Sequence, residues 1–408
     1  MPPNSLGGTV LLPSMLADLR DLVRCESFST DHAAVARSAE VVGALGARLL
    51  GCAPEVVVVG GVSHLRWRFG KPRVLVLGHH DTVWPAGSLR TRPWSVAGGV
   101  ARGPGVLDMK AWLVQMFHAL ASLPSLDGVC VLVNGDEEVG SPTSRGLIEE
   151  AARGAIAAFV LEAAGDGGAL KVARKGAVRY EIVVRGRAAH AGLEPGRGVN
   201  AAVEAAHQVL AVSELGGGEV GVEGAAGDAS AGGTTVTPTL LSCGTSRNTV
   251  PALARISVDV RVPTAAEQDR VDRHLRGLTA RTPGARLEVL DQGGRPPMRA
   301  SAELFALAAL AAAGLGQEPP PGIAVGGVSD ANYTAAVGCP TLDGLGAVGG
   351  GAHSDDEYVE VAWMVPRARL LAELVARTLR APGVRPAPRH PRASESRPGS
   401  QHRRPPEP

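Results

Sequence analysis

The chain has 408 residues, 45% of them apolar, and its 41 Lys and Arg residues nearly balance its 40 Asp and Glu residues. This length predicts two or three domains with a large buried core. A net charge of +1 argues against a strongly basic nucleic-acid-binding protein, and no uninterrupted apolar run of about 18 residues indicates a membrane span. The N-terminal residues lack the pattern of a secretory signal, so we expect a cytoplasmic protein.

The cysteines are few, scattered and odd in number, so they predict neither a disulfide framework nor a thiolate zinc site. If the protein binds a metal ion, we therefore expect His and carboxylate ligands. The five are Cys25, Cys52, Cys130, Cys243 and Cys339.

The first part of the chain alternates between amphipathic helices and short apolar strands. Such alternation predicts an α/β fold with a mainly parallel central sheet, and Val-rich runs are typical of strands buried on both faces. In chain order the predicted elements are helices 11–24 and 33–50, strands 56–59, 65–69 and 73–77, helix 109–123, strand 129–133, helix 143–153 and strand 157–161.

The middle of the chain has a different pattern, which predicts a compact α+β insertion. Its expected elements are strand 178–185, helix 200–212, a Gly-rich loop at 215–233, strands 234–243 and 254–262, and helix 265–278. Helices 302–313 and 365–379 follow, and a final segment rich in Pro and Arg is expected to be disordered. We thus predict a catalytic domain at 1–176 and 293–380, an inserted domain at 177–292 and a tail at 381–408.

Two polar residues follow the predicted strand 73–77. His79 and Asp81 are two apart, and such residues point the same way along an extended backbone. His79 could then bind a metal ion while Asp81 holds its other ring nitrogen. The alternative is an ordinary polar turn.

Acidic residues and a second histidine lie in similar places. Asp108 stands where a Gly-rich loop meets a predicted helix, as either a metal ligand or an N-cap. Glu137 and Glu138 follow strand 129–133, where adjacent acids could divide between general base and metal ligand, or could favour a helix N-terminus. Glu162 ends strand 157–161, and His353 lies in a Gly-rich loop. Together these side chains suit two zinc ions.

These motifs, in this order, resemble the co-catalytic zinc exopeptidase and amidohydrolase family. The family includes glutamate carboxypeptidase, acetylornithine deacetylase, succinyl-diaminopimelate desuccinylase and aminoacylase. The resemblance covers about residues 10–380, and the segments 326–331 and 349–359 look most like the glutamate carboxypeptidase branch. It implies a zinc-exopeptidase-like catalytic domain with an inserted dimerisation domain.

The resemblance also implies roles for single residues around two Zn²⁺ ions per subunit. Asp108 would bridge both ions, His79 and Glu162 would hold one, and Glu138 and His353 the other. Asp81 would orient His79, and Glu137 would be the general base that takes a proton from water and passes it to the leaving nitrogen. Co²⁺ or Mn²⁺ could also occupy His and carboxylate sites.

Four further residues are implied to act on the substrate. His190, in the family's dimerisation-domain motif, would reach the partner's site in a homodimer and stabilise the oxyanion. Asn248 would contact the substrate, and Arg261 and Arg295 would receive its carboxylate, which an Arg fork matches. The alternatives are a loop histidine and surface ion pairs. His80 and Met109 depart from the family's pattern, and His80 could offer a competing imidazole.

The predicted function is that of a two-zinc metallohydrolase. It would cleave the amide bond of an N-acyl amino acid, or release a glutamate-like C-terminal amino acid from a peptide or conjugate with a free carboxylate. The alternatives are a deacylating or amide-releasing enzyme of a specialised biosynthetic pathway and a non-catalytic binding protein.

Overall fold

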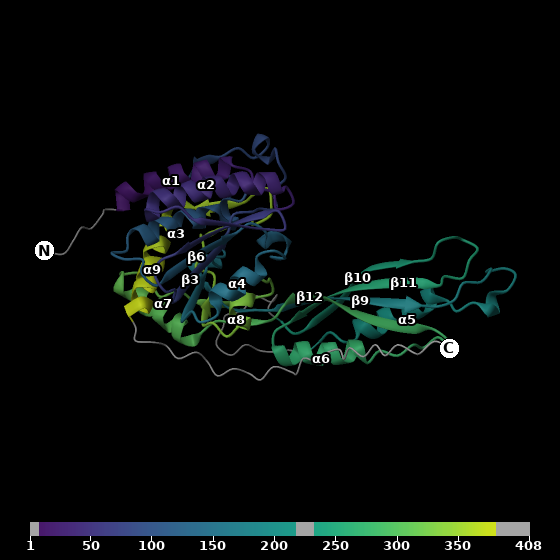
Figure 1. The fold of residues 1–408 in the computed structure, drawn as a ribbon. Helices are drawn as coiled ribbons and strands as arrows, with labels where there is room; N and C mark the ends of the chain where they lie inside the picture. The colour runs from purple at the N-terminus through teal and green to yellow at the C-terminus, as the bar shows by residue number, and fades with distance from the viewer. Residues whose placement is uncertain (1–7, 218–231, 381–408) are drawn as a thin grey trace, which may run out of the picture.

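The computed structural model describes residues 8–217 and 232–380. In Figure 1 a rounded α/β body carries an elongated arm formed by the middle of the chain. The predicted tail at 381–408 and most of the predicted loop at 215–233 lie outside the described residues. In the part of the chain that is described, no helix is both long and apolar enough to cross a membrane.

The body is built on a six-stranded sheet in the order β1-β2-β6-β3-β7-β15. Its centre is parallel: β3 pairs in parallel with β6 and β7, whereas β2 runs antiparallel to β6. The bounds are β1 Glu55–Val59, β2 Val62–Arg68, β3 Val74–His79, β6 Val129–Asn134, β7 Ala157–Val160 and β15 Thr341–Leu342.

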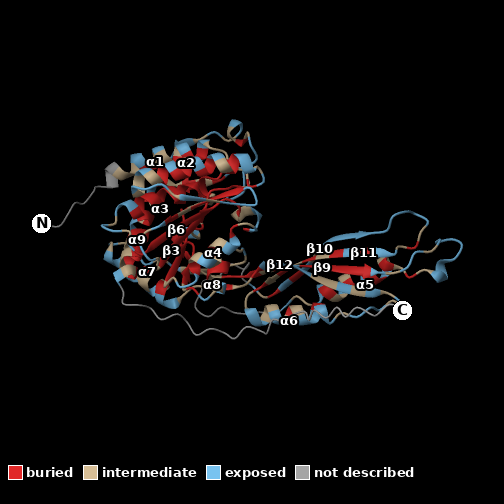
Figure 2. Cartoon of the chain, viewed as in Figure 1, coloured by how far each residue is buried: buried red, intermediate tan, exposed pale blue. Residues whose placement is uncertain are grey.

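Helices cover both faces of this sheet, and alternate residues of each strand face opposite layers. On β3, Val74 and Val76 pack in one core with five helices, while Leu75 and Leu77 pack in a second core with two others. Figure 2 shows how completely the central strands are buried. The first layer is α1 Gly8–Arg24, α2 His32–Leu50, α3 Ala111–Ala121, α7 Ala302–Gly314 and α9 Val361–Arg380, and the second is α4 Arg145–Ala152 and α8 Ala331–Ala336.

Local signals in the sequence explain where α2 begins and ends. The side chain of Asp31 accepts a hydrogen bond from the backbone N–H of Ala34, which caps the first turn. Gly51 follows the last turn at φ 79°, a left-handed conformation that favours glycine. The expected helix 33–50 is therefore found with its bounds almost unchanged.

The arm is a four-stranded antiparallel sheet in the order β10-β11-β9-β12, packed against α5 and α6 through one apolar core. Its last strand was not predicted, and it runs through residue 292, where the sequence placed a domain boundary. The bounds are β9 Gly176–Arg185, α5 Ala201–Ser213, β10 Thr235–Cys243, β11 Leu253–Val262, α6 Ala265–Arg276 and β12 Arg286–Arg295.

Two small sheets complete the body, and neither was predicted. One joins β13, β8 and β14 beside the start of the arm, and the other joins β16, β17, β5 and β4. The second brings the segment that precedes Asp108 against the segment that follows His353. The bounds are β4 Ser95–Ala97, β5 Val100–Arg102, β8 Leu170–Arg174, β13 Met298–Arg299, β14 Gly322–Val325, β16 Gly349–Gly350 and β17 Tyr358–Glu360.

Candidate metal centre

The parallel strands bring several predicted site residues to one edge of the central sheet. His79, the last residue of β3, lies opposite Asn134, the last residue of β6. Glu137 and Glu138 come shortly after β6, and Glu162 comes two residues after β7. In open α/β sheets, ligands bind at the carboxyl ends of the strands, so this edge is where chemistry is expected.

Asp108 lies between two histidines and presents one oxygen to each. Its Oδ1 is 3.1 Å from His79 Nε2, and its Oδ2 is 3.3 Å from His353 Nε2. His353 Nε2 is also 3.2 Å from Oε2 of Glu138. A carboxylate with one oxygen near each of two histidines has the arrangement expected of a ligand that bridges two metal ions.

The donor set fits divalent metal ions. Among the residues that the structure describes, two groups have ligand atoms within 4.8 Å of one another. They are His79 with Asp108 and Glu138, and His79 with Glu137 and Glu162. Two ligand atoms of one tetrahedral zinc ion, each at about 2.0–2.1 Å, are separated by roughly 3.3 Å, as the histidine–carboxylate contacts here are. Glu137, the predicted base, thus lies within reach of the same ligands.

Asp81 is a fully buried carboxylate with several donors. His79 Nδ1 is 3.3 Å from its Oδ1 and 3.0 Å from its backbone oxygen. Asp81 also accepts from Ser29 Oγ at 2.7 Å and from the backbone N–H groups of Glu137 and Glu138 at 3.1 and 3.2 Å. Asp81 therefore contacts the imidazole of His79 and also accepts hydrogen bonds from the backbone of the two glutamates, a contact that the sequence did not predict.

The three consecutive acids after β6 have different surroundings. Asp136 accepts hydrogen bonds from the backbone and hydroxyl groups of Thr143 and Ser144, just before α4. Asp136 therefore stabilises the N-terminal end of α4, which is the alternative role that the sequence allowed for an acid at this place. Glu137 and Glu138 instead face the group of metal-binding candidates.

Burial shifts the pKa values of three glutamates of the centre toward neutral pH. Burial raises the pKa of Glu137 to about 8, against the attraction of Arg295, and raises the pKa of Glu138 and of Glu162 to about 7. Hydrogen bonds to Asp108 and Glu138 raise the pKa of His353 to about 10. Buried carboxylates of this kind gain from a bound cation, which favours their ionised form.

Arg295 lies inside the site rather than at its rim. Its side chain donates to Glu137 Oε1 at 2.6 Å, to Ser141 Oγ at 2.9 Å and to Asp330 Oδ1 at 3.1 Å, and the residue is only 5% exposed. Asp330 also accepts from Asn134, at 2.8 Å. Sequence reasoning assigned no role to Asp330 or Ser141, although Asp330 belongs to the motif 326–331.

The other predicted substrate residues divide between the two ends of the arm. Arg261 pairs with Ala177 at the end near the body, where it also contacts Asp259. His190 forms an isolated antiparallel β-bridge with Thr249, the residue after Asn248. This bridge lies beyond the last pair of strands β9 and β11, at the other end of the arm. The ten residues of β9, at about 3.3 Å each, carry the chain about 30 Å between these ends. His190 and Asn248 therefore lie at the end of the arm that is far from the body, which carries the candidate metal centre. Figure 1 shows how far the arm extends from the body.

The two departures from the family's pattern leave the metal-binding candidates in place. His80 is buried, and its Nε2 lies 3.0 Å from the backbone oxygen of Ser63 on β2, so it is directed into the fold. Burial lowers its pKa to about 4. The sulfur of Met109 accepts a hydrogen bond from the backbone N–H of His79 at 2.9 Å.

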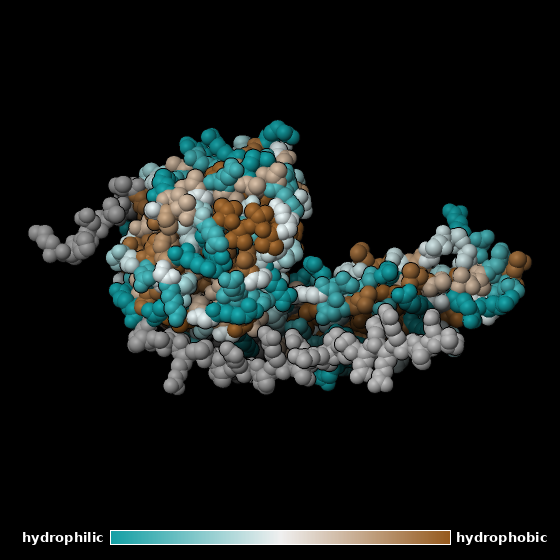
Figure 3. Space-filling view, in the orientation of Figure 1, coloured by the Kyte–Doolittle hydropathy of each residue, from teal (hydrophilic) through white to brown (hydrophobic). Residues whose placement is uncertain are grey.

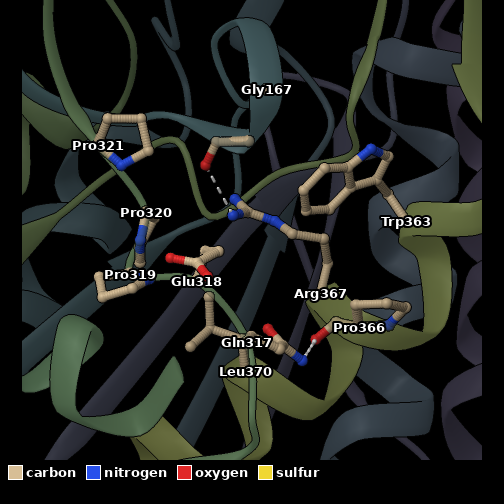
Figure 4. Close-up of a pocket in the computed structure, with 11 residues that line it drawn as sticks. Gly167, Gln317, Glu318, Pro319, Pro320, Pro321, Trp363, Pro366, Arg367 and Leu370 are labelled. Atoms are coloured by element: carbon tan, nitrogen blue, oxygen red, sulfur yellow. Dashed lines mark hydrogen bonds between the residues drawn. The ribbon is translucent and has the colours of Figure 1, made fainter. Parts of the chain in front are cut away.

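A cavity of about 310 Å³ lies elsewhere on the body, and none of the site residues discussed above lines it. Figure 4 shows the lining residues, with the side chain of Arg367 between Trp363 and the Pro319–Pro321 run. The guanidinium of Arg367 donates to the backbone oxygens of Gly168, Gly344 and Gly346. It therefore connects the segment around Gly168 with the segment 344–346. The cavity is thus separate from the group of metal-binding candidates at the sheet edge.

Comparison with known sequences decides the family. The sequence model of peptidase family M20/M25/M40 matches residues 75–377. The chain belongs to this family. The resemblance that the motifs indicated is therefore confirmed, and membership of the M20/M25/M40 family makes the protein a metallohydrolase.

Individual relatives agree with this membership. The chain is 31% identical to carboxypeptidase G2 of Pseudomonas sp. strain RS-16 over 386 residues, which cover 89% of each sequence. It is 28% identical to succinyl-diaminopimelate desuccinylase of Granulibacter bethesdensis over 319 residues, 71% of this chain and 78% of that enzyme. A dinuclear metal-binding M20 peptidase from Bacillus subtilis has the same α/β fold, with a TM-score of 0.63 at 16% identity over 91% of this chain and 99% of that one.

Proposed function

We propose that this M20/M25/M40 protein is a two-zinc carboxypeptidase or N-acyl amino acid hydrolase that releases a glutamate-like amino acid from an amide. The observation that carries this proposal is the shared Asp108 carboxylate between His79 and His353, with Glu137 beside it. Similarity to carboxypeptidase G2 over most of both chains supports the carboxypeptidase assignment.

In this proposal the ligands are His79, Asp108, Glu138, Glu162 and His353. Bound zinc would polarise the amide carbonyl and lower the pKa of a water molecule. Glu137 accepts the proton of the attacking water and returns it to the leaving nitrogen, which requires only hydrogen-bond reach. Arg295 binds Oε1 of Glu137, so Oε2 is the oxygen that receives the proton.

The active form is proposed to be a homodimer formed through the arm, which corresponds to the inserted domain at 177–292. Strand β10 lies at the edge of its sheet, and an edge strand leaves backbone groups that a second strand can pair. Leu240 and Leu241 on this strand are 70% and 58% exposed, and Leu210 on α5 is 64% exposed. Figure 3 shows hydrophobic side chains at the surface of the arm. In such a dimer, His190 and Asn248 of one subunit would serve the partner's metal centre.

One experiment tests the reaction. The zinc-loaded protein is assayed against acetyl-, succinyl-, aminoacyl- and pteroyl-glutamate-like substrates, and zinc is counted per subunit. We expect two ions per subunit and release of the amino acid. Glu137→Gln should lower kcat about 10²- to 10⁴-fold, because proton transfer is lost. Glu318→Gln, at the exposed rim of the separate cavity, is the matched control and should keep full activity. Full turnover by Glu137→Gln would exclude Glu137 as the base.

The same substrate panel distinguishes a carboxypeptidase from the second candidate function, that of a deacylase. This candidate is favoured by the similarity to succinyl-diaminopimelate desuccinylase over 319 residues. The chemistry and site residues are the same, but the preferred substrate would carry a small acyl group rather than an aminoacyl or pteroyl group. A preference for succinyl over aminoacyl substrates would favour it.

A further inference from the structure

Glu357 is a buried acid to which the proposed function gives no role. It lies four residues after His353 and directly before β17, and it is only 4% exposed. A buried carboxylate is costly unless it is hydrogen-bonded or paired. Its partners therefore show what it stabilises.

Four donors converge on the two oxygens of Glu357. Oε1 accepts from the backbone N–H groups of Leu107 and Asp108, at 2.8 and 3.1 Å. Oε2 accepts from the backbone N–H of Gly105 at 3.0 Å and from Trp84 Nε1 at 2.7 Å. Each oxygen thus binds two donors, and three of the four belong to the short segment that ends at Asp108.

This segment has little regular structure to hold it. Asp108 has φ −116° and ψ 91°, which is not helical. Gly105 is at φ 69°, and a Cβ there would meet Thr82 Cγ2 at 2.5 Å, so the turn packs tightly against the segment that carries His79 and Asp81. Without Glu357, the buried backbone N–H groups of this turn would lose their acceptor.

The contacts of Glu357 join three segments of the proposed metal centre. Trp84 follows the His79 segment, the turn carries Asp108, and Glu357 itself follows His353. We propose that Glu357 is a positioning residue that fixes the Asp108 carboxylate between the two histidines and so sets the affinity of the site for metal. The inference rests on the proposed metal centre, and its test reads metal binding rather than turnover.

Glu357→Gln changes one oxygen into an NH₂ group while nearly preserving size. That NH₂ would face two donors in place of an acceptor, so the turn must move or lose hydrogen bonds. Removing a group that orients a metal ligand typically costs about 10- to 100-fold in metal affinity, and we expect that loss here. Glu360→Gln is the matched control, because Glu360 ends the same strand β17 and is only partly buried.

The measurement is Zn²⁺ affinity by chelator competition on the full-length protein, together with the visible absorption of the Co²⁺-loaded form, which reports the coordination geometry. Far-UV circular dichroism of the metal-free protein checks the fold. A folded Glu357→Gln protein with weakened Zn²⁺ binding and an altered Co²⁺ spectrum supports the proposal. Wild-type affinity and an unchanged spectrum would overturn it.

A second variant tests the positioning role of Glu357 if the Glu357→Gln protein does not fold. Trp84→Phe retains the carboxylate and most of the ring but removes one of the four hydrogen bonds. We expect a smaller fall in Zn²⁺ affinity, and an affinity equal to that of the wild type would then contradict the proposal. A wild-type protein that binds no Zn²⁺ would refute the proposed metal centre itself, which is a different outcome.

Discussion

At the scale of single residues, the candidate metal centre depends on close packing behind the side chains proposed as its ligands. Gly346 lies against the backbone of Glu162: a Cβ there would stand 1.8 Å from the Glu162 carbonyl oxygen and 2.3 Å from Trp112 Nε1. Such distances are too short for any side chain, so Glu162 and the loop after β15 can pack this closely only because residue 346 is glycine.

Gly346→Ala should therefore destabilise the protein and displace Glu162. The expected loss is about 1–3 kcal/mol of unfolding free energy, the usual cost of overpacking. Gly146→Ala is the control: Gly146 is an exposed residue of α4, and a Cβ there meets nothing within 4 Å, so stability should stay the same or rise by about 0.5–1 kcal/mol. Thermal denaturation of both variants measures the difference, and equal Tm values would contradict the packing argument.

The cysteines allow a second prediction at this scale. Burial raises the pKa of Cys130 to about 11 and of Cys339 to about 12, whereas Cys52 and Cys243 are exposed. Because the thiolate is the reactive form, the native protein should be alkylated at the exposed pair and spared at the buried pair. Mass spectrometry after brief iodoacetamide treatment checks this, and the denatured protein, in which all sites react, is the control.

At the scale of elements, the sequence predicted the helices and strands whose formation depends on short-range patterns of apolar residues. Strands β3, β6 and β7 were expected because they are short apolar runs, and those of β3 and β6 are rich in Val. Strand β12 was not, because Gly293 and Gly294 interrupt it and its register shifts between Asp291 and Gly294. Some very short strands of the small sheets pair with partners far along the chain, as β17 does with β5 and β13 with β8.

The same distinction applies to the site. The strand-end positions of His79, Glu138 and Glu162 follow from local pattern, and the roles given to them remain predictions. The buried contacts of Glu357 and Asp330 depend on long-range packing, which no spacing in the sequence reveals. In the sequence, Glu357 is the last of three consecutive acids after His353, and nothing there distinguishes it from Asp355 and Asp356.

A charge placed on strand β10 should disrupt the homodimer that is proposed to form through the arm. Leu241→Lys places a charge on an exposed edge position and should dissociate the proposed homodimer, because burying an unpaired charge in an apolar interface is costly. Leu310→Lys on α7 is the control, since Leu310 is 61% exposed on the body. Analytical ultracentrifugation should find a folded monomer only for the first variant. A dimer that persists in Leu241→Lys would contradict an interface on β10.

At the scale of the whole molecule, the arm separates residues that the proposed reaction needs together. Glu137 lies in the body, while His190 lies beyond the far end of β9, about 30 Å along that strand from the body. His190 is exposed, and its Nδ1 atom accepts from the backbone N–H groups of Gly192 and Leu193, at 3.1 Å each. The homodimer proposed above would resolve this separation, because a second subunit would complete each site.

Mixing two inactive variants tests this arrangement. His190→Ala and Glu137→Gln homodimers should each be nearly inactive, because every site lacks one group. In a heterodimer, the subunit that keeps Glu137 receives His190 from its partner, so one of its two sites is complete. Random exchange of equal amounts makes about half of the dimers mixed, which should restore about a quarter of the wild-type activity. If His190 instead served its own subunit, each site in the mixed dimer would still lack one group, and dissociating and reassociating the two variants together would restore nothing.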